Sequence, residues 1–140
     1  MIRDLSTKSR VTNVEINRIV GKPYPFFQRL KLGGIASPRF DLISTSKRIA
    51  EKLLSKSPSL KCRIELRPRG VIILFLFARN TYAWIIPYWR LNIVKTYNNV
   101  SIYAEEDFVK MTLKNTKNQQ RFMRKLIYFK AWSIECQSMN

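Results

Sequence analysis

From residue 60 onward, apolar and polar residues alternate along the chain, which is the pattern of β-strands. Residues 60–67 place Cys62, Ile64 and Leu66 on one side and mostly charged residues on the other, as in a half-buried strand. Residues 71–77 are apolar throughout, which predicts a central strand covered on both faces. Further strands are predicted at 81–95, 100–104 and 108–113, with turns at 68–70, 79–80, 98–99 and 105–107.

Pro87 lies inside the predicted strand 81–95. Because proline has no N–H to give to a neighbouring strand, we expect a bulge or a sheet edge there. The residues that follow are aromatic, basic and apolar, a combination that is enriched at protein interfaces. They either turn inward behind the bulge or form a surface for a homodimer or another partner: Tyr88, Trp89, Arg90 and Leu91.

Residues 38–57 have apolar residues at helical spacing. Ser37 and Pro38 are typical of a helix cap and first turn, and Pro58 ends the pattern. The weak point of this predicted helix is the run Ser-Thr-Ser at 44–46, since these residues are poor helix formers. Residues 1–36 are predicted to form one short element and irregular chain, because Gly21 and the prolines after it interrupt regular structure.

A last helix is predicted at about 117–134, with Asn115 or Thr116 as its cap and a frayed tail after it. Its apolar stripe is Phe122, Met123, Leu126, Ile127 and Phe129. The chain is therefore predicted to be an α+β protein. An antiparallel meander of about five strands is preceded by a helical region and closed by a C-terminal amphipathic helix. With 140 residues, it is expected to be a single domain, with a basic lead-in at 1–58 and the sheet and last helix at 60–134.

The charge of the chain points to an anionic partner. The sequence has 26 Lys and Arg against 9 Asp and Glu, a net charge of +17. Such a charge attracts nucleic acid or an anionic membrane face, although it is also compatible with a solvated surface that has no specific anionic partner. Residues 1–70 carry a net charge of +11 and the rest +6, so the first half is the more cationic.

The residues that most enzymes use are scarce. The chain has no histidine, which removes the commonest general base and metal ligand, and it has no glycine-rich phosphate-binding motif. Cys62 and Cys136 are expected to be buried free thiols, and the acidic cluster at 105–107 is expected to be a solvated turn. We therefore expect a non-catalytic protein without metal or cofactor. With no signal sequence and no apolar run long enough to span a bilayer, it is expected to be soluble and cytoplasmic, or peripheral at the membrane.

Basic and aromatic residues are interleaved in the first 40 residues. The aromatic ones are Tyr24, Phe26, Phe27 and Phe40. This mixture suits a bilayer interface, where cations meet head groups, and it also suits single-stranded nucleic acid, where bases stack on rings. The interpretation that we favour for the rings themselves is that they cover the second face of the sheet. The candidate anion-binding residues, for a phospholipid surface or an acidic protein, are Arg18, Lys22, Arg29, Lys31 and Arg39.

A meander closed by one C-terminal amphipathic helix resembles the pleckstrin-homology-like fold over about residues 60–134. The segments 64–73, 82–88 and 107–110 also look like uncharacterised small bacterial proteins of that kind. The resemblance implies a binding module for lipid head groups or peptides. Two departures are the count of about five strands, where that fold has seven, and the helical region before the sheet.

A competing resemblance is to the double-stranded-RNA-binding domain, whose order is helix, three strands, helix. Residues 38–134 have that order if two extra strands are tolerated. The start of the last helix has Asn118-Gln-Gln instead of the expected lysines and small residues. On this alternative the phosphate contacts would be Lys114, Lys117, Arg121, Arg124 and Lys125.

Overall fold

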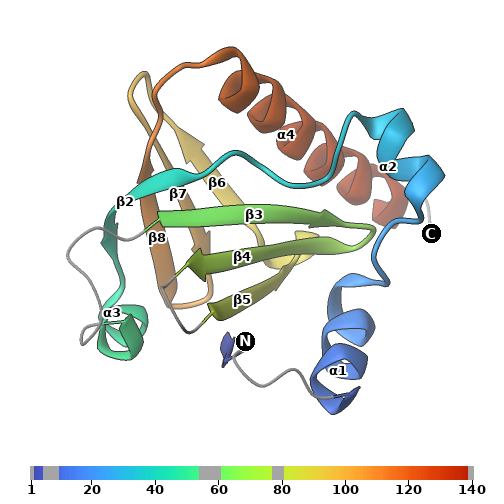
Figure 1. Cartoon of the computed structure of the whole chain (residues 1–140), viewed down its shortest axis with the longest axis horizontal. Coiled ribbons are helices and arrows are strands. Elements are labelled where there is room, and N and C mark those ends of the chain that lie inside the picture. Colours follow the sequence, from blue (N-terminus) through green and yellow to red (C-terminus); the bar gives the residue numbers. More distant parts are fainter. Residues whose placement is uncertain (1, 5–9, 54–60, 77–80, 139–140) are drawn as a thin grey trace.

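The fold is described by a computed structural model that covers residues 2–4, 10–53, 61–76 and 81–138 (Figure 1). It is an α+β fold in which one antiparallel sheet is combined with helices on its outside. In chain order the elements are β1 Ile2–Asp4, α1 Arg10–Val20, α2 Phe26–Leu32, β2 Phe40–Thr45, α3 Lys47–Leu53, β3 Lys61–Arg67, β4 Gly70–Leu76, β5 Thr81–Pro87, the 3-10 turn η1 Tyr88–Arg90, β6 Asn92–Lys95, β7 Asn99–Ala104, β8 Asp107–Thr112 and α4 Lys117–Ser138.

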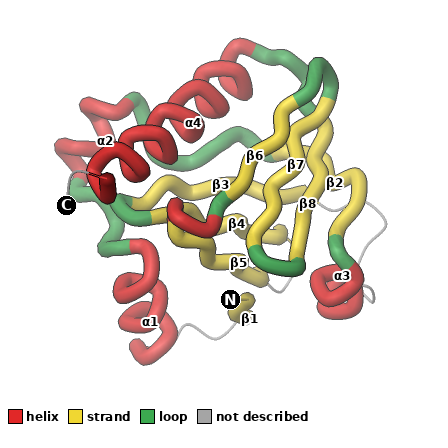
Figure 2. The backbone as a smooth tube through the Cα atoms, turned by 180° about the vertical axis from the view of Figure 1, so that it is seen from behind, coloured by secondary structure: helices red, strands yellow, loops and turns green. Residues whose placement is uncertain are grey.

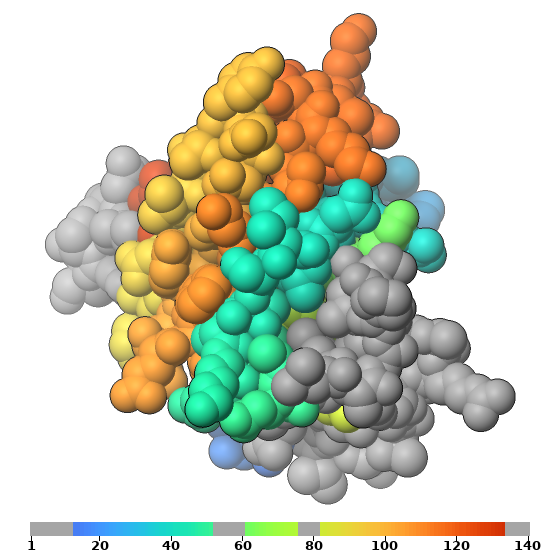
Figure 3. All heavy atoms as spheres, turned by 90° about the vertical axis from the view of Figure 1, so that its left-hand side faces the viewer, coloured from blue at the N-terminus to red at the C-terminus, as the bar shows by residue number. Residues whose placement is uncertain are grey.

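The strand order in the sheet is β1-β5-β4-β3-β2-β8-β7-β6. Seven strands, β2 to β8, form two meanders that meet at β2, and β1 pairs with β5 at one edge. Phe40 and Asp41 of β2 pair with β3, whereas residues from Leu42 to Thr45 pair with β8, and the register shifts between Leu42 and Ser44. Figure 1 shows β3–β5 running across the view and β6–β8 running steeply to them, so the sheet folds over on itself at β2. Figure 3, which faces the left-hand side of Figure 1, shows β2 at the surface beside β8.

The main core lies between the two meanders and is closed by α4. Along β4, Val71, Ile73 and Phe75 point into it, while Ile72 and Leu74 point to the opposite face. On that second face α1 packs against β4 and β5 through Ile16, Ile19 and Val20. The prediction that 71–77 is a central strand covered on both faces is thus confirmed for the residues up to Phe75. The cover is aliphatic and comes from α1, so the expectation that the N-terminal aromatic rings provide it is wrong.

The predicted helix at 38–57 is wrong in its first half. Residues 40–45 form β2, and α3 starts only at Lys47. Phe40 is fully buried in the main core, and the Ser-Thr-Ser run at 44–46, which disfavours a helix, ends the strand. The Ser46 hydroxyl donates to Asp107 Oδ1 at 2.8 Å, and the Ala50 N–H donates to the Ser46 carbonyl as α3 begins. The predicted end of this helix at Ser57 and Pro58 lies outside the described residues.

The predicted strand 81–95 is two strands, which is one reason why the described sheet has more strands than the five predicted. The interruption at Pro87 is confirmed, but it is a 3-10 turn, after which the chain changes partner. β5 pairs with β4, whereas β6 pairs with β7 in the other meander. Tyr88 and Leu91 turn inward and are buried, while Trp89 is 60% exposed. The predicted turn at 79–80 lies outside the described residues.

The remaining predictions concern the two ends of the chain. The first 36 residues hold more regular structure than the single short element predicted, namely β1, α1 and α2. Gly21 and Gly33 end the two helices at positive φ, which glycine adopts without strain. The predicted start of α4 is confirmed, with Thr116 Oγ1 accepting the Gln119 N–H at 3.2 Å, but α4 continues to Ser138 instead of fraying from residue 136. None of the helices in the described part of the chain has the length and apolar character needed to cross a bilayer.

Candidate functional site

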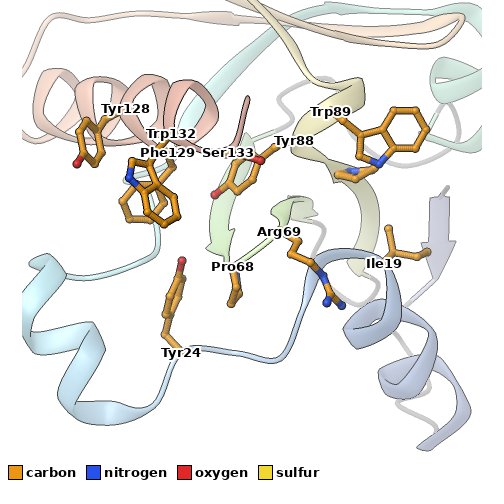
Figure 4. Close-up of a pocket in the computed structure, with 11 residues that line it drawn as sticks. Ile19, Tyr24, Pro68, Arg69, Tyr88, Trp89, Tyr128, Phe129, Trp132 and Ser133 are labelled. Carbon is orange, nitrogen blue, oxygen red and sulfur yellow. The ribbon is translucent and has the colours of Figure 1, made fainter. Parts of the chain in front are cut away.

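A hollow lies where α1, the chain after it, the β3–β4 turn, η1 and α4 meet. It has a volume of about 820 Å³. The C-terminal half of α4 lines it with Tyr128, Phe129, Trp132 and Ser133, and η1 lines it with Tyr88 and Trp89. Figure 4 shows the rings of α4 on one side, Trp89 and Ile19 on the other, and Pro68 of the β3–β4 turn between them. Tyr24, from the chain between α1 and α2, points toward the α4 rings. The lining is largely aromatic, as in sites for apolar ligands.

Tyr88 holds three of these segments together. Its N–H donates to the Arg69 carbonyl at 3.0 Å, and its buried hydroxyl donates to the Arg67 carbonyl at 2.9 Å. Its own carbonyl accepts from Lys130 Nζ of α4 at 3.1 Å. Burial, with a smaller contribution from Tyr24, raises the pKa of Tyr88, so its hydroxyl stays protonated and remains a donor. The floor of the hollow is therefore fixed by hydrogen bonds.

A buried arginine fixes the position of α1 beside the hollow. The Arg67 side chain donates to Glu65 Oε2 at 2.7 Å, to the Gly21 carbonyl at 2.9 Å and to Asn17 Oδ1 at 3.1 Å. The bonds to Asn17 and Gly21 join β3 to the last turn of α1 and the glycine after it, whereas the bond to Glu65 lies within β3. Glu65 thus pairs with a basic residue of its own strand.

A second hollow, of about 640 Å³, adjoins the first and shares Tyr24, Pro68 and Arg69 with it. Arg18 and Lys22 line only this second hollow. Nη2 of Arg69 donates to the carbonyls of Asn17 and Arg18, each at 3.1 Å, so the guanidinium caps the C-terminal end of α1. No acidic residue lines either hollow in the described part of the chain. The pair is thus an aromatic hollow joined to a cationic one.

Large apolar side chains are exposed around this end of the molecule. On α2, Phe26, Phe27 and Leu30 are 65%, 76% and 63% exposed. On α4, Tyr128 and Trp132 are 63% and 58% exposed. The two helices lie side by side (Figures 1 and 2). Two contacts connect α4 to the chain on either side of α2. Before α2, the Tyr24 ring lies against the Phe129 ring, with centroids 6.4 Å apart, and after α2 the Gly34 carbonyl accepts from Lys125 Nζ. We call this surface of α2 and α4 the aromatic end; α3 lies on the opposite side of the molecule (Figure 2).

The structure brings only some of the predicted anion-binding residues together. Arg18 and Lys22 line the second hollow. Arg29 Nε donates to the Tyr24 carbonyl at 2.9 Å, and Lys31 is exposed on the same helix, α2. Arg39 is exposed just before β2 and lines neither hollow.

Sequence reasoning missed several residues of the site. Arg69 is central to both hollows, and its signal was a basic residue in a predicted turn. The rings of Tyr128 and Trp132 lie off the apolar stripe of the last helix. Aromatic residues outside the apolar stripe of a helix are a sequence signal for a binding surface.

The residues proposed for the double-stranded-RNA alternative are partly occupied by internal partners. Lys114 Nζ lies 2.9 Å from Asp41 Oδ2, and this hydrogen bond is the main cause that lowers the pKa of Asp41. Lys125 donates to the Gly34 carbonyl, and burial, with Arg121 beside it, lowers the pKa of its amine. Lys117, Arg121 and Arg124 are exposed on the first half of α4. In addition, β2 precedes α3 and six strands separate α3 from α4, so the order is not helix, three strands, helix.

The described residues contain no group of three or more His, Cys, Asp or Glu side chains placed to hold a metal ion. In the acidic cluster, Glu105 pairs with Arg90, Glu106 lies 3.9 Å from Arg48, and Asp107 is buried against Ser46. Glu105 and Glu106 occupy the β7–β8 turn, as predicted, but Asp107 is the first residue of β8 and is buried, so the expectation of a solvated turn is wrong for Asp107. Cys62 is a buried free thiol, and burial, with Asp41 as the smaller cause, raises its pKa to about 12. The Cys136 side chain lies outside the described residues.

Comparison of the chain with protein-family models, curated proteins and solved structures finds no match. Any statement about function therefore depends on the site itself.

Proposed function

We propose that the chain is a non-catalytic binding module that attaches to an anionic phospholipid surface through its aromatic end. The observation that carries the proposal is the exposure of Phe26, Phe27 and Leu30 on a short helix next to exposed rings of α4. Large apolar side chains that are exposed close together mark protein or membrane interaction sites. Aromatic side chains of this kind enter the boundary between head groups and acyl chains.

The charges around the aromatic end favour a membrane over a neutral partner. Arg29 and Lys31 flank the exposed Leu30 on α2, and Arg18 and Lys22 line the adjoining hollow. A basic residue near an anionic bilayer contributes about 1 kcal/mol to binding. The anionic leaflet that such a protein would meet is the cytoplasmic one, so we propose a cytoplasmic protein that is peripheral at the membrane.

Two other partners are less well supported. An acidic protein would satisfy the charges, but it would not need three large apolar side chains on one short helix. Nucleic acid would require lysines that have no internal partner, and two of the five residues assigned to it, Lys114 and Lys125, are bonded to Asp41 and Gly34. Both remain outcomes of the experiment below.

We also propose that the fold is pleckstrin-homology-like. In support, the strands β2 to β8 number seven, as in that fold, and α4 follows the last strand and closes the main core. The helices α1 and α2, together with β1, would then be additions to the fold, and one of the two helices of the aromatic end, α2, would be such an addition.

The test is cosedimentation with vesicles of phosphatidylcholine alone or mixed with phosphatidylserine, at about 0.05 and about 0.2 M salt. The disruptive variant is Phe27→Ser/Leu30→Ser, which removes two exposed apolar side chains from α2. Its matched control is Val94→Ser/Tyr97→Ser, which removes two exposed apolar side chains from β6 and the turn after it. We expect the first variant to lose affinity for anionic vesicles by roughly tenfold or more, and the control to bind like the wild type.

Attachment to anionic vesicles that is as strong in the α2 variant as in the wild type would overturn the proposal. So would equal attachment to neutral vesicles, since the cations would then contribute nothing. Duplex RNA, duplex DNA and a single strand are titrated in parallel. Tighter binding to any of these, with a steep loss between the two salt concentrations, would replace the membrane by nucleic acid. Binding to neither vesicles nor nucleic acid would leave an acidic protein as the partner.

A further inference from the structure

Beyond attachment to a surface, we propose that the two joined hollows hold one anionic lipid molecule. Its phosphate head group would lie against Arg18, Lys22 and Arg69, and its acyl part would lie in the aromatic hollow along Tyr88 toward Trp132. This inference deepens the proposed function and rests on it.

The first argument is the shape of the site. The aromatic hollow, at about 820 Å³, has the size and lining of a pocket for a small apolar ligand. It shares Tyr24, Pro68 and Arg69 with the cationic hollow, so the two hollows adjoin and place an apolar and a charged part side by side. A ligand that fills both must itself be apolar at one end and anionic at the other.

The second argument is that Arg69 is oriented before any ligand binds. Within the described part of the chain, only Nη2 of its guanidinium has hydrogen-bond partners, the carbonyls of Asn17 and Arg18. A guanidinium has five N–H donors in a fixed plane, and the N–H groups of Nη1 and Nε remain for a phosphate oxygen. Figure 4 shows this side chain reaching toward Ile19, on the side of the hollow away from the α4 rings.

The third argument is charge. Three cationic side chains line the joined hollows, and no acidic residue does so in the described part of the chain. The ion pairs of nearby basic residues are elsewhere, since Arg67 pairs with Glu65 and Arg90 pairs with Glu105. Within the described part of the chain Arg18, Lys22 and Arg69 form no ion pair, so all three attract an anion that enters the joined hollows.

The experiment measures binding of a lipid without a bilayer. Dihexanoyl phosphatidic acid, kept below its micelle concentration, is titrated by calorimetry, with dihexanoyl phosphatidylcholine and inorganic phosphate as comparison ligands. We expect phosphatidic acid to bind more tightly than phosphatidylcholine because of the cations. We expect inorganic phosphate to bind much more weakly than either lipid because it leaves the aromatic hollow empty.

Three variants test this inference, and the first two separate it from attachment to a surface. Ser133→Phe fills the aromatic hollow and leaves α2 unchanged. It should weaken phosphatidic acid at least roughly tenfold while vesicle attachment persists. Phe27 lines neither hollow, so Phe27→Ser should weaken vesicle attachment and leave the binding of phosphatidic acid unchanged. Lys22→Gln should weaken phosphatidic acid about fivefold and leave phosphatidylcholine unchanged, with Lys47→Gln on α3 as the matched control.

Three results would each overturn the single-lipid site. No binding of phosphatidic acid by a wild type that does attach to vesicles would overturn the single-lipid site and leave the proposed function standing. Equal binding by Ser133→Phe would place the lipid elsewhere and also overturn it. If Ser133→Phe fails to fold, the smaller Ser133→Leu is used together with nuclear Overhauser contacts between the acyl protons and Phe129 in the wild type. The absence of those contacts in a saturated complex would refute the inference.

Discussion

Replacing Arg67 by Met tests whether a single buried cation holds α1 against the sheet. Met preserves most of the apolar volume of the side chain but removes all three of its hydrogen bonds, at 2.7, 2.9 and 3.1 Å. The Arg67 and Glu65 side chains are 11% and 28% exposed, so water replaces the lost bonds only in part. Hydrogen bonds that involve a charge contribute about 1.5–3 kcal/mol each. Relief of the cost of burying the guanidinium offsets part of this sum, which leaves a net loss of about 3 kcal/mol.

The assay is urea unfolding followed by circular dichroism, with a thermal scan beside it. A loss of about 3 kcal/mol is survivable for a domain whose stability is about 5–15 kcal/mol, and it should lower the melting temperature by roughly 10 °C. The matched control is Arg63→Met, which removes an exposed arginine from the same strand and should change stability by less than about 0.5 kcal/mol. A loss below about 1 kcal/mol for Arg67→Met would refute the reasoning, because the three bonds would then contribute no more than ordinary surface contacts.

Three further predictions concern other parts of the fold. Gly70→Ala should cost about 3 kcal/mol in urea unfolding, because the added Cβ would lie 2.6 Å from Val20 Cγ1 and against the Ile86 carbonyl; a stable variant would show that α1 is not packed this closely. Burial raises the pKa of Cys62 from 9.0 to about 12, so the stability that its neutral thiol contributes is present below about pH 9 and is lost as the pH rises toward about 12. Between about pH 9 and about pH 11, wild-type stability should therefore fall more steeply than that of Cys62→Ala, by up to about 1.4 kcal/mol per pH unit, and equal slopes would contradict the burial of this thiol. Trp89→Glu should stay folded, since Trp89 is 60% exposed. Sedimentation of the wild type and the variant then tests the predicted homodimer. A dimeric wild type and a monomeric variant would support an interface at 88–91, whereas a monomeric wild type would contradict that interface.

The alternation of apolar residues was sufficient to predict the strands from residue 60 onward. Residues 61–67 and 70–76 pair in the register expected for neighbouring strands with a tight turn, and α4 begins where its cap was expected. These elements are local in sequence, so periodicity and capping residues determine them. The break at Pro87 was also predictable from the missing N–H. The change of partner after it was not, because it depends on which half of the sheet the next four residues can reach.

The site was less accessible to sequence reasoning than the sheet. The helical spacing over 38–57 hid β2, because Leu42 and Ile43 lie seven residues before Ile49 and Ala50 and so fit the same helical stripe. Arg18 and Lys22 were predicted from their proximity to aromatic residues. Arg69 and Trp132 were not, since they meet Tyr24 only after α1, β3 and α4 have packed. A basic residue buried in ion pairs, such as Arg67, is indistinguishable by sequence from one exposed to solvent, such as Arg63.

The pairing of β2 with β8 has a consequence for how the chain folds. Leu42 and Met111 are paired although they are about 70 residues apart in the chain. Closing a loop of that length has an entropic cost on the order of 4 kcal/mol, which precedes any stabilisation by the contact between the two strands. The meander β3–β5 can form from neighbours alone, whereas the second meander meets the first only when β8 finds β2. We therefore expect refolding to be slow for a chain of this size, on a scale of milliseconds to seconds. We also expect mutations in β2 to slow refolding, because this strand has to be in place when the two meanders meet.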